Sequence, residues 1–217
     1  MGYQQEIRLA GSVLDRAWHI CAFFNSREEE YRVLLPLIKE GFEQGNRASH
    51  IIEPQNRDEH WRRLKEAGID VEEAERRGQL AILTWDVVQL KDGYFDQERT
   101  IALIEGQLAE GRARGFNLTR LIARMQWALE NRPGVNELVE YEARLNQALQ
   151  KYDDVVCCAY DVSRFSASVI LDILRIHPYV LIGEALHRNP FFTPPDEFLR
   201  ELRERARDAP GGQGDKG

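Results

Sequence analysis

The stretch HICAFFNSREEEY, from His19 to Tyr31, decides the fold class. Its first six residues, His19–Phe24, form a short and largely apolar run, which is typical of a strand buried on both faces. Ser26 and Glu29 then match a capping box, in which the Ser26 hydroxyl accepts from the Glu29 amide and the carboxylate reaches back. Apolar residues follow at helical spacing from Tyr31 to Phe42. The stretch therefore predicts a buried strand that leads through a short junction into an amphipathic helix.

The alternation of strand and helix continues along the chain. Further strands are predicted at residues 48–53, 78–85, 118–127, 155–160 and 179–182. Helical patterns separate them, one capped by Asp96 and another running from Ser166 to Ile176. Strands that alternate with helices form βαβ units with parallel pairing. We therefore expect a three-layer α/β/α sandwich with a mainly parallel sheet.

Composition bounds the size of the fold and the classes of partner. The 217 residues, 43% of them hydrophobic, suffice for one domain, which we assign to residues 1–205. Residues 206–217 have little apolar content and predict a disordered tail. The formal net charge is −7 and no basic stripe is present, which argues against a nucleic-acid partner.

The location of the protein is inferred from three negative features of the sequence. No apolar run approaches the roughly 20 residues that span a bilayer, so we expect no membrane segment. The N-terminal residues lack the apolar core of a signal peptide. The three cysteines, Cys21, Cys157 and Cys158, do not make a disulfide framework. Together these features favour a cytoplasmic protein.

Short motifs spread over residues 15–200 resemble a known family of sensory domains. They are His19–Phe24, Glu29 and Glu30 at a helix start, Glu40–Gly45, Ala67–Val71, Gly78–Leu80, Arg124–Trp127, His177–Gly183, Asn189–Phe192 and the Pro194–Pro195 pair. In this order and spacing the chain resembles the MEDS domain, the methanogen/methylotroph sensory domain of the dichloromethane-regulator type. The resemblance implies a RecA/KaiC-like ATPase fold without a P-loop.

The same resemblance implies a function. Such domains are similar to cytoplasmic sensors of small, often hydrocarbon-like ligands, and they occur beside DNA-binding or histidine-kinase modules. This chain carries no recognisable output module. We therefore expect it to signal through a separate protein partner, and direct binding of DNA is not expected.

The junction after the first strand lacks the parts of a nucleotide site. A P-loop needs G-x-x-x-x-G-K-[ST], whereas residues 23–30 contain no glycine and no Lys-Ser/Thr pair. Three carboxylates, Glu28, Glu29 and Glu30, occupy the helix start, where a phosphate would need donors. Arg124–Trp127 offers no Walker-B carboxylate. Because the residues that bind phosphate and metal are absent, Glu53 has no attacking water to activate.

The carboxyl ends of the predicted strands are the expected ligand site, because open α/β sheets bind ligands there. The residues that fall at these ends are Phe23, Phe24, Glu53, Trp85, Asp86, Trp127, Tyr160 and Asp161. Their rings predict the walls of an apolar pocket, with carboxylates as polar contacts. The alternative is that the rings pack beneath the helices. The loops at 25–30, 86–96 and 183–195 are the expected moving parts.

A second candidate cluster involves His19 and Cys21, which alternate and so point to one face of the first strand. Only one of Cys157 and Cys158 can approach that face. No C-x-x-C or H-x-x-x-H spacing is present, so the sequence predicts no metal and no cofactor. The favoured interpretation is a hydrogen-bonded core histidine beside inert thiols.

Three functions remain open on sequence grounds. The first is a sensory domain that binds a small, largely apolar organic ligand and shifts between two states. The second is a ligand-free scaffold for a kinase or anti-sigma-type partner, and the third is a residual nucleotide-binding protein. A homodimer is compatible with each. No catalytic motif is present, so an enzyme is not expected.

Overall fold

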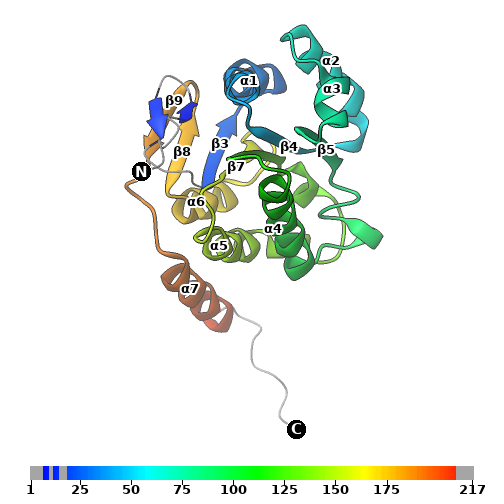
Figure 1. Ribbon diagram of the computed structural model, residues 1–217. Coiled ribbons are helices and arrows are strands. Elements are labelled where there is room, and N and C mark those ends of the chain that lie inside the picture. The colour runs from blue at the N-terminus through cyan, green and yellow to red at the C-terminus, as the bar shows by residue number, and fades with distance from the viewer. Residues whose placement is uncertain (1–6, 10–11, 15–18, 209–217) are drawn as a thin grey trace.

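The computed structural model describes residues 7–9, 12–14 and 19–208 of the chain. A seven-stranded sheet forms its centre (Figure 1), in the order β5-β4-β6-β7-β3-β8-β9. The strands are β3 (His19–Phe24), β4 (Arg47–Ile52), β5 (Leu80–Thr84), β6 (Thr119–Arg124), β7 (Val155–Asp161), β8 (Tyr179–Ile182) and β9 (Ala185–Arg188). All pairs are parallel except β8 with β9. The mainly parallel sheet confirms the fold class predicted from sequence.

Helices cover both faces of this sheet (Figure 1). One face carries α1 (Arg27–Glu43), α2 (Arg57–Glu66) and α3 (Val71–Arg76). The other carries α4 (Gln97–Ala113), α5 (Leu138–Leu149), α6 (Ala167–Ile176) and α7 (Pro195–Asp208). Four 3-10 turns lie between them: η1 (Pro54–Asn56), η2 (Lys91–Gly93), η3 (Gln126–Leu129) and η4 (Val135–Glu137). The result is the expected three-layer sandwich.

Alternation along β3 divides the core into two layers. Ile20, Ala22 and Phe24 face the α1 side, whereas Cys21 and Phe23 face the α5 side. All six residues of β3 are buried, as a central strand covered on both faces requires. The helix after it begins as predicted, because Ser26 accepts from the Glu29 amide at 3.2 Å.

Three features were not anticipated by the sequence analysis. A separate antiparallel pair, β1 (Ile7–Leu9) and β2 (Ser12–Leu14), precedes the main sheet. The edge strand β9 closes the sheet in antiparallel fashion. The predicted disordered tail at 206–217 is wrong for its first residues, since α7 continues to Asp208. The remainder of that segment lies outside the described residues.

Among the described helices, none is long and apolar enough to cross a membrane.

Candidate functional site

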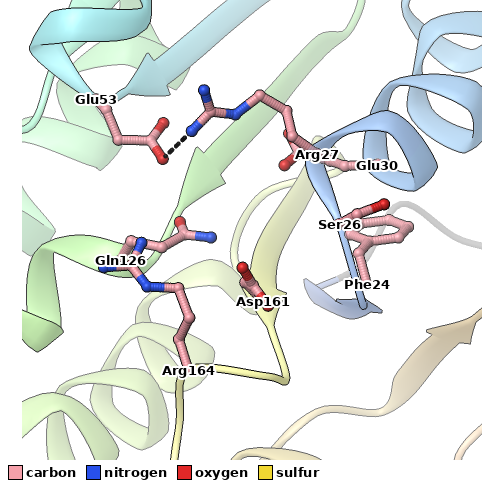
Figure 2. A pocket seen from close by; sticks show the side chains of 8 residues that line it. All are labelled: Phe24, Ser26, Arg27, Glu30, Glu53, Gln126, Asp161 and Arg164. Carbon is pink, nitrogen blue, oxygen red and sulfur yellow. Dashed lines mark hydrogen bonds and ion pairs between the residues drawn. The ribbon is translucent and has the colours of Figure 1, made fainter.

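The carboxyl ends of four central strands surround a small pocket (Figure 2). The chain leaves β3 and β4 toward α1 and α2 on one face, and leaves β6 and β7 toward α5 and α6 on the other. The neighbours β4 and β6 therefore send their helices to opposite faces, and so do the neighbours β7 and β3, which opens a crevice at the sheet edge. The lining residues are Phe24, Ser26, Arg27, Glu30, Glu53, Gln126, Asp161 and Arg164.

A buried arginine organises one side of this pocket. Arg124, the last residue of β6, donates from Nε to Glu30 Oε1 at 2.7 Å and from Nη1 to Glu53 Oε2 at 3.1 Å. Arg27 donates to the other Glu53 oxygen at 3.1 Å, as the dashed line in Figure 2 marks. Both oxygens of Glu53 are thus held by guanidinium groups, which is the arrangement a buried carboxylate needs.

Charge and burial compete at these two carboxylates. Burial acts to raise the pKa of Glu53, yet Arg124 and Arg27 hold that pKa below its ordinary value. Burial raises the pKa of Glu30, and the pairing with Arg124 only partly opposes the increase. Glu53 therefore remains an anion at neutral pH, anchored between two cations.

The start of α1 is satisfied by groups of the protein itself. The Glu29 amide donates to Ser26 Oγ, and the Asn25 amide donates to Glu29 Oε2 at 2.8 Å. Glu28 is ion-paired with Arg63 of α2. Two amides of the turn between β3 and α1 are therefore paired with side chains of the protein, and carboxylates surround the position that a phosphate would occupy in a phosphate-binding loop.

Two polar groups in the pocket are not satisfied in this way. Gln126 is 5% exposed, and its Oε1 has no hydrogen-bond partner among the described residues. The Arg164 guanidinium, on the turn after β7, makes no ion pair within the described part of the chain. Figure 2 shows Gln126, Arg164 and Asp161 among the side chains that line the pocket. The cavity volume is about 30 Å³, close to the space of a single small molecule such as water.

Comparison with a family model decides which family this fold and site belong to. The model described as MEDS, the methanogen/methylotroph, DcmR sensory domain, matches residues 18–178. The chain belongs to the MEDS family. It is a domain of a sensory family, which places it in the signalling and regulatory class.

Relatives of this MEDS domain agree with that assignment. The transcriptional repressor DcmR of Methylorubrum extorquens is 28% identical over 160 residues, which cover 73% of this chain and 57% of DcmR. The matched part thus spans little more than half of that repressor.

Two solved structures show the same fold. A KaiC-like protein of Pyrococcus horikoshii OT3 aligns with a TM-score of 0.54 at 14% identity, over 76% of this chain and 70% of the other. An uncharacterized protein of Pyrococcus horikoshii, solved with an unknown peptide, aligns with a TM-score of 0.57 at 16% identity, over 78% of both chains. The KaiC-like fold expected from sequence is confirmed.

The predicted ligand-binding residues of the MEDS domain divide into two groups. Phe24, Glu53 and Asp161 line the pocket. Phe23, Trp85, Trp127 and Tyr160 are buried in the core on the α5 side instead, and Asp86 is exposed. The structure therefore does not show the aromatic-walled pocket that the sequence predicted.

Ring packing explains why these aromatics leave no cavity. Trp127 stacks on Phe95 with centroids 4.3 Å apart, and Tyr141 meets both rings edge-on. Tyr160 lies between Phe23 and Phe165, at 6.0 Å and 5.3 Å. Sequence placed the rings at the correct strand ends, but the helices of the second layer fill the space between them.

The second candidate cluster has a different composition from the predicted His19 and Cys21. His19 meets Cys158, Glu142 and His177, all four of them buried. Cys21 is not part of this group, because its thiol lies 3.7 Å from the Tyr179 carbonyl. Burial, aided by His177, lowers the pKa of His19 to about 4, which keeps the imidazole neutral near pH 7. These four residues are the group among the described side chains that could hold a metal.

Sequence reasoning missed several of these residues, although some left a signal. Arg124 interrupts the apolar run Leu121–Ala123, and Glu142 follows Leu138 by four residues on the buried helix face. A charge on an apolar stripe indicates a buried partner. Arg164 lies in a polar turn, and Gln126 lies in the short turn Gln126–Leu129 after β6; neither left a comparable signal.

Proposed function

We propose that this MEDS domain is the input domain of a regulatory system and binds a small polar organic molecule in the carboxyl-edge pocket. The observation that carries the proposal is the buried, unpartnered Gln126 oxygen, which lies in a pocket at the switch point of the sheet. A buried acceptor without a donor is costly, by roughly 1–3 kcal/mol, so such groups mark places where a water or ligand belongs.

The lining favours a polar ligand over the apolar one expected from sequence. Among the described lining residues Phe24 is the one hydrocarbon side chain. The carboxylates of Glu30, Glu53 and Asp161 already accept from Arg124, Arg27 and Ser163. A complementary ligand donates to Gln126 Oε1 and accepts from the Arg164 guanidinium, as a small hydroxy compound or hydroxy acid does.

A ligand of that size must enlarge the pocket, which supplies a signalling mechanism. A cavity of about 30 Å³ has room for little more than a water molecule, and we propose that a larger ligand displaces the Arg27 side chain, which is 35% exposed, from Glu53. Arg27 opens α1, which covers one face of the sheet. Ligand binding would then bias the position of the α1 start between two states, and a separate protein partner would read the difference.

We further propose that the domain is not an ATPase. Carboxylates of Glu28, Glu29 and Glu30 occupy the first turn of α1, and Arg124 instead of an acidic residue ends β6. Calorimetry with ATP and Mg²⁺ should give no dissociation constant below about 100 μM. Tighter binding would revive the residual nucleotide-binding hypothesis.

The test of the ligand proposal compares Gln126 with a buried glutamine elsewhere. Thermal unfolding would be followed with a panel of one- to four-carbon alcohols, hydroxy acids, carboxylates, hydrocarbons and halocarbons. We expect polar members to raise the melting temperature of the wild type and of Gln79→Leu, whose amide lies at the amino end of the sheet. Gln126→Leu should fold, lose an unpartnered oxygen and fail to respond. Stabilisation by the hydrocarbons but by none of the polar compounds would instead support the apolar ligand expected from the sequence.

An exposed apolar groove, formed by α6 and the loop before α7, favours a second function. Leu171 of α6 and Phe191 of the loop before α7 are 60% and 65% exposed, and they line a groove of about 580 Å³ with Leu174 and Arg175. Apolar side chains exposed together are typical of protein contacts. Two results together would favour the scaffold hypothesis over the sensor. No compound of the panel stabilises the domain, and Leu171→Glu abolishes self-association of the domain or its binding to a protein partner.

A further inference from the structure

We propose that His19, Glu142, Cys158 and His177 form a closed, four-coordinate site for a zinc ion. The four ligand atoms are His19 Nε2, His177 Nε2, Glu142 Oε2 and Cys158 Sγ, and all lie within 4.8 Å of one another. They come from β3, α5, β7 and the α6–β8 junction. The site lies in the second layer, apart from the carboxyl-edge pocket, and does not depend on the proposed function.

The spacing of these atoms is that of a tetrahedral shell. With bonds of about 2.0–2.1 Å to nitrogen or oxygen and about 2.3 Å to sulfur, the edges of a zinc tetrahedron measure about 3.3–3.7 Å. His19 Nε2 lies 3.2 Å from His177 Nε2, 3.2 Å from Glu142 Oε2 and 3.2 Å from Cys158 Sγ. Glu142 Oε2 lies 3.4 Å from His177 Nε2 and 3.7 Å from Cys158 Sγ. Four of these five separations lie within about 0.2 Å of the edges expected for their atom pairs, and the His19–Cys158 separation is about 0.3 Å shorter. The remaining pair, His177 Nε2 and Cys158 Sγ, lies within 4.8 Å.

Hydrogen bonds behind two of the ligands, His177 and Glu142, leave the correct atoms free to bind, whereas His19 Nδ1 has no partner among the described residues. His177 Nδ1 lies 2.7 Å from the Ile173 carbonyl, which accepts only if Nδ1 carries the proton, so Nε2 presents its lone pair. The Tyr160 hydroxyl donates to Glu142 Oε1 at 2.6 Å and leaves Oε2 for the shared centre. Support of this kind for histidine and carboxylate ligands is typical of metal sites.

With both histidines neutral and no metal ion bound, the cluster lacks enough donors. If His19 donates its Nε2 proton to Glu142, the His177 lone pair faces it at 3.2 Å without a proton of its own to share. If His19 donates to His177 instead, Glu142 Oε2 has only the weak thiol donor at 3.7 Å. The four side chains are between 0% and 1% exposed, so no open solvent compensates. A divalent cation would satisfy the converging lone pairs together.

The donor set identifies the ion and its role. Two imidazoles, one carboxylate and one thiolate suit zinc, which prefers nitrogen and sulfur ligands in a tetrahedral arrangement. Four protein ligands leave no position for water, which is the character of a structural site. Such an ion would hold the helix layer of α5 and α6 against β3 and β7.

The test uses two adjacent cysteines as a matched pair. Cys157 and Cys158 are both at most 1% exposed, but they face opposite layers of the sheet. The full chain, refolded with Zn²⁺ in reducing buffer and dialysed, should retain about one equivalent of metal by mass spectrometry. Refolded with Co²⁺, it should show intense tetrahedral d–d bands and a thiolate-to-cobalt charge-transfer band. That band should persist in Cys157→Ala and disappear in Cys158→Ala.

Two results would overturn the site. One is a wild type that retains neither Zn²⁺ nor Co²⁺ after refolding, and the other is a charge-transfer band that survives in Cys158→Ala. If Cys158→Ala does not fold, X-ray absorption of the zinc-loaded wild type decides alone. A single sulfur among nitrogen and oxygen neighbours supports the site, and any other shell excludes it. The ligand panel described above is unaffected by either outcome.

Discussion

Arg124 and Glu30 meet at the carboxyl edge of the sheet, with Nε 2.7 Å from Oε1, although 94 residues separate them in the chain. The pair lies where the first helix turn of a nucleotide-binding fold would approach its ligand. Here a protein cation occupies that position and also holds Glu53 at 3.1 Å. Glu30 and Glu53, both held by Arg124, therefore line one wall of the pocket. On our proposal the same network excludes a nucleotide.

Replacing Arg124 should show how much unfolding free energy is lost when the buried carboxylates Glu30 and Glu53 lose this cation. Arg124→Met leaves Glu30 and Glu53 buried beside an apolar side chain, so we expect it to lose about 3–5 kcal/mol of unfolding free energy. Arg164→Met, on the exposed turn, should change stability by less than about 0.5 kcal/mol. Urea unfolding at pH 7 measures both. Equal effects would show that Arg124 is not the anchor of the network.

Stability should fall in mild acid because of a second buried histidine pair. His50 Nδ1 lies 2.8 Å from His60 Nε2, and burial, aided by Arg124, lowers the pKa of His50 from 6.5 to about 3. The unfolded chain therefore binds a proton that the folded chain does not, and His50 contributes a loss of up to about 1.4 kcal/mol per pH unit below 6.5.

Urea titrations between pH 7.5 and pH 4.5, a range chosen to cross roughly two pH units below an ordinary histidine pKa, measure this slope. His50→Gln keeps an acceptor for His60 but removes the titrating group, so its slope should be shallower than that of the wild type. An unchanged slope would assign the acid sensitivity to other groups.

The aromatic core should be more sensitive to truncation than the surface. Trp127 is fully buried and stacks on Phe95, so Trp127→Ala should cost about 3–5 kcal/mol. Trp61 on α2 is only partly buried and contacts Lys65, so Trp61→Ala should cost about 1 kcal/mol or less. Denaturation of both variants gives the comparison. A small loss for Trp127→Ala would mean that the ring lies in a looser environment than the structure shows.

Two glycines of α4 should respond in opposite directions. A Cβ at Gly111 would overlap Thr119 Oγ1 and crowd Arg47 Cδ at 3.3 Å, because the helix approaches the sheet closely there. Gly111→Ala should therefore destabilise by about 1–3 kcal/mol. A Cβ at Gly106 would meet nothing within 4 Å, so Gly106→Ala should stabilise by about 0.5–1 kcal/mol. Thermal unfolding of the two variants measures this difference. A higher melting temperature for Gly111→Ala than for Gly106→Ala would contradict this account.

Local patterns in the sequence determined the elements and their arrangement in layers. The apolar run from His19 to Phe24 and the Ser26 cap describe one βα junction, and both depend on neighbours within a few residues. The Asp96 cap behaves in the same way, accepting from the Arg99 amide at 2.8 Å. The absence of a phosphate-binding loop could also be read directly, because that motif is local.

Tertiary structure alone decided which strand-end residues face a cavity and which face the core. Trp127 follows β6 and Asp161 ends β7, yet the first is covered by Phe95 and the second lines the pocket. Likewise, Cys158 of the neighbouring strand β7, rather than Cys21 of β3 itself, lies with His19, Glu142 of α5 and His177 after α6. Strand periodicity gives the face of each side chain. Its neighbours depend on pairing and helix packing between segments far apart in the chain, which no local pattern contains.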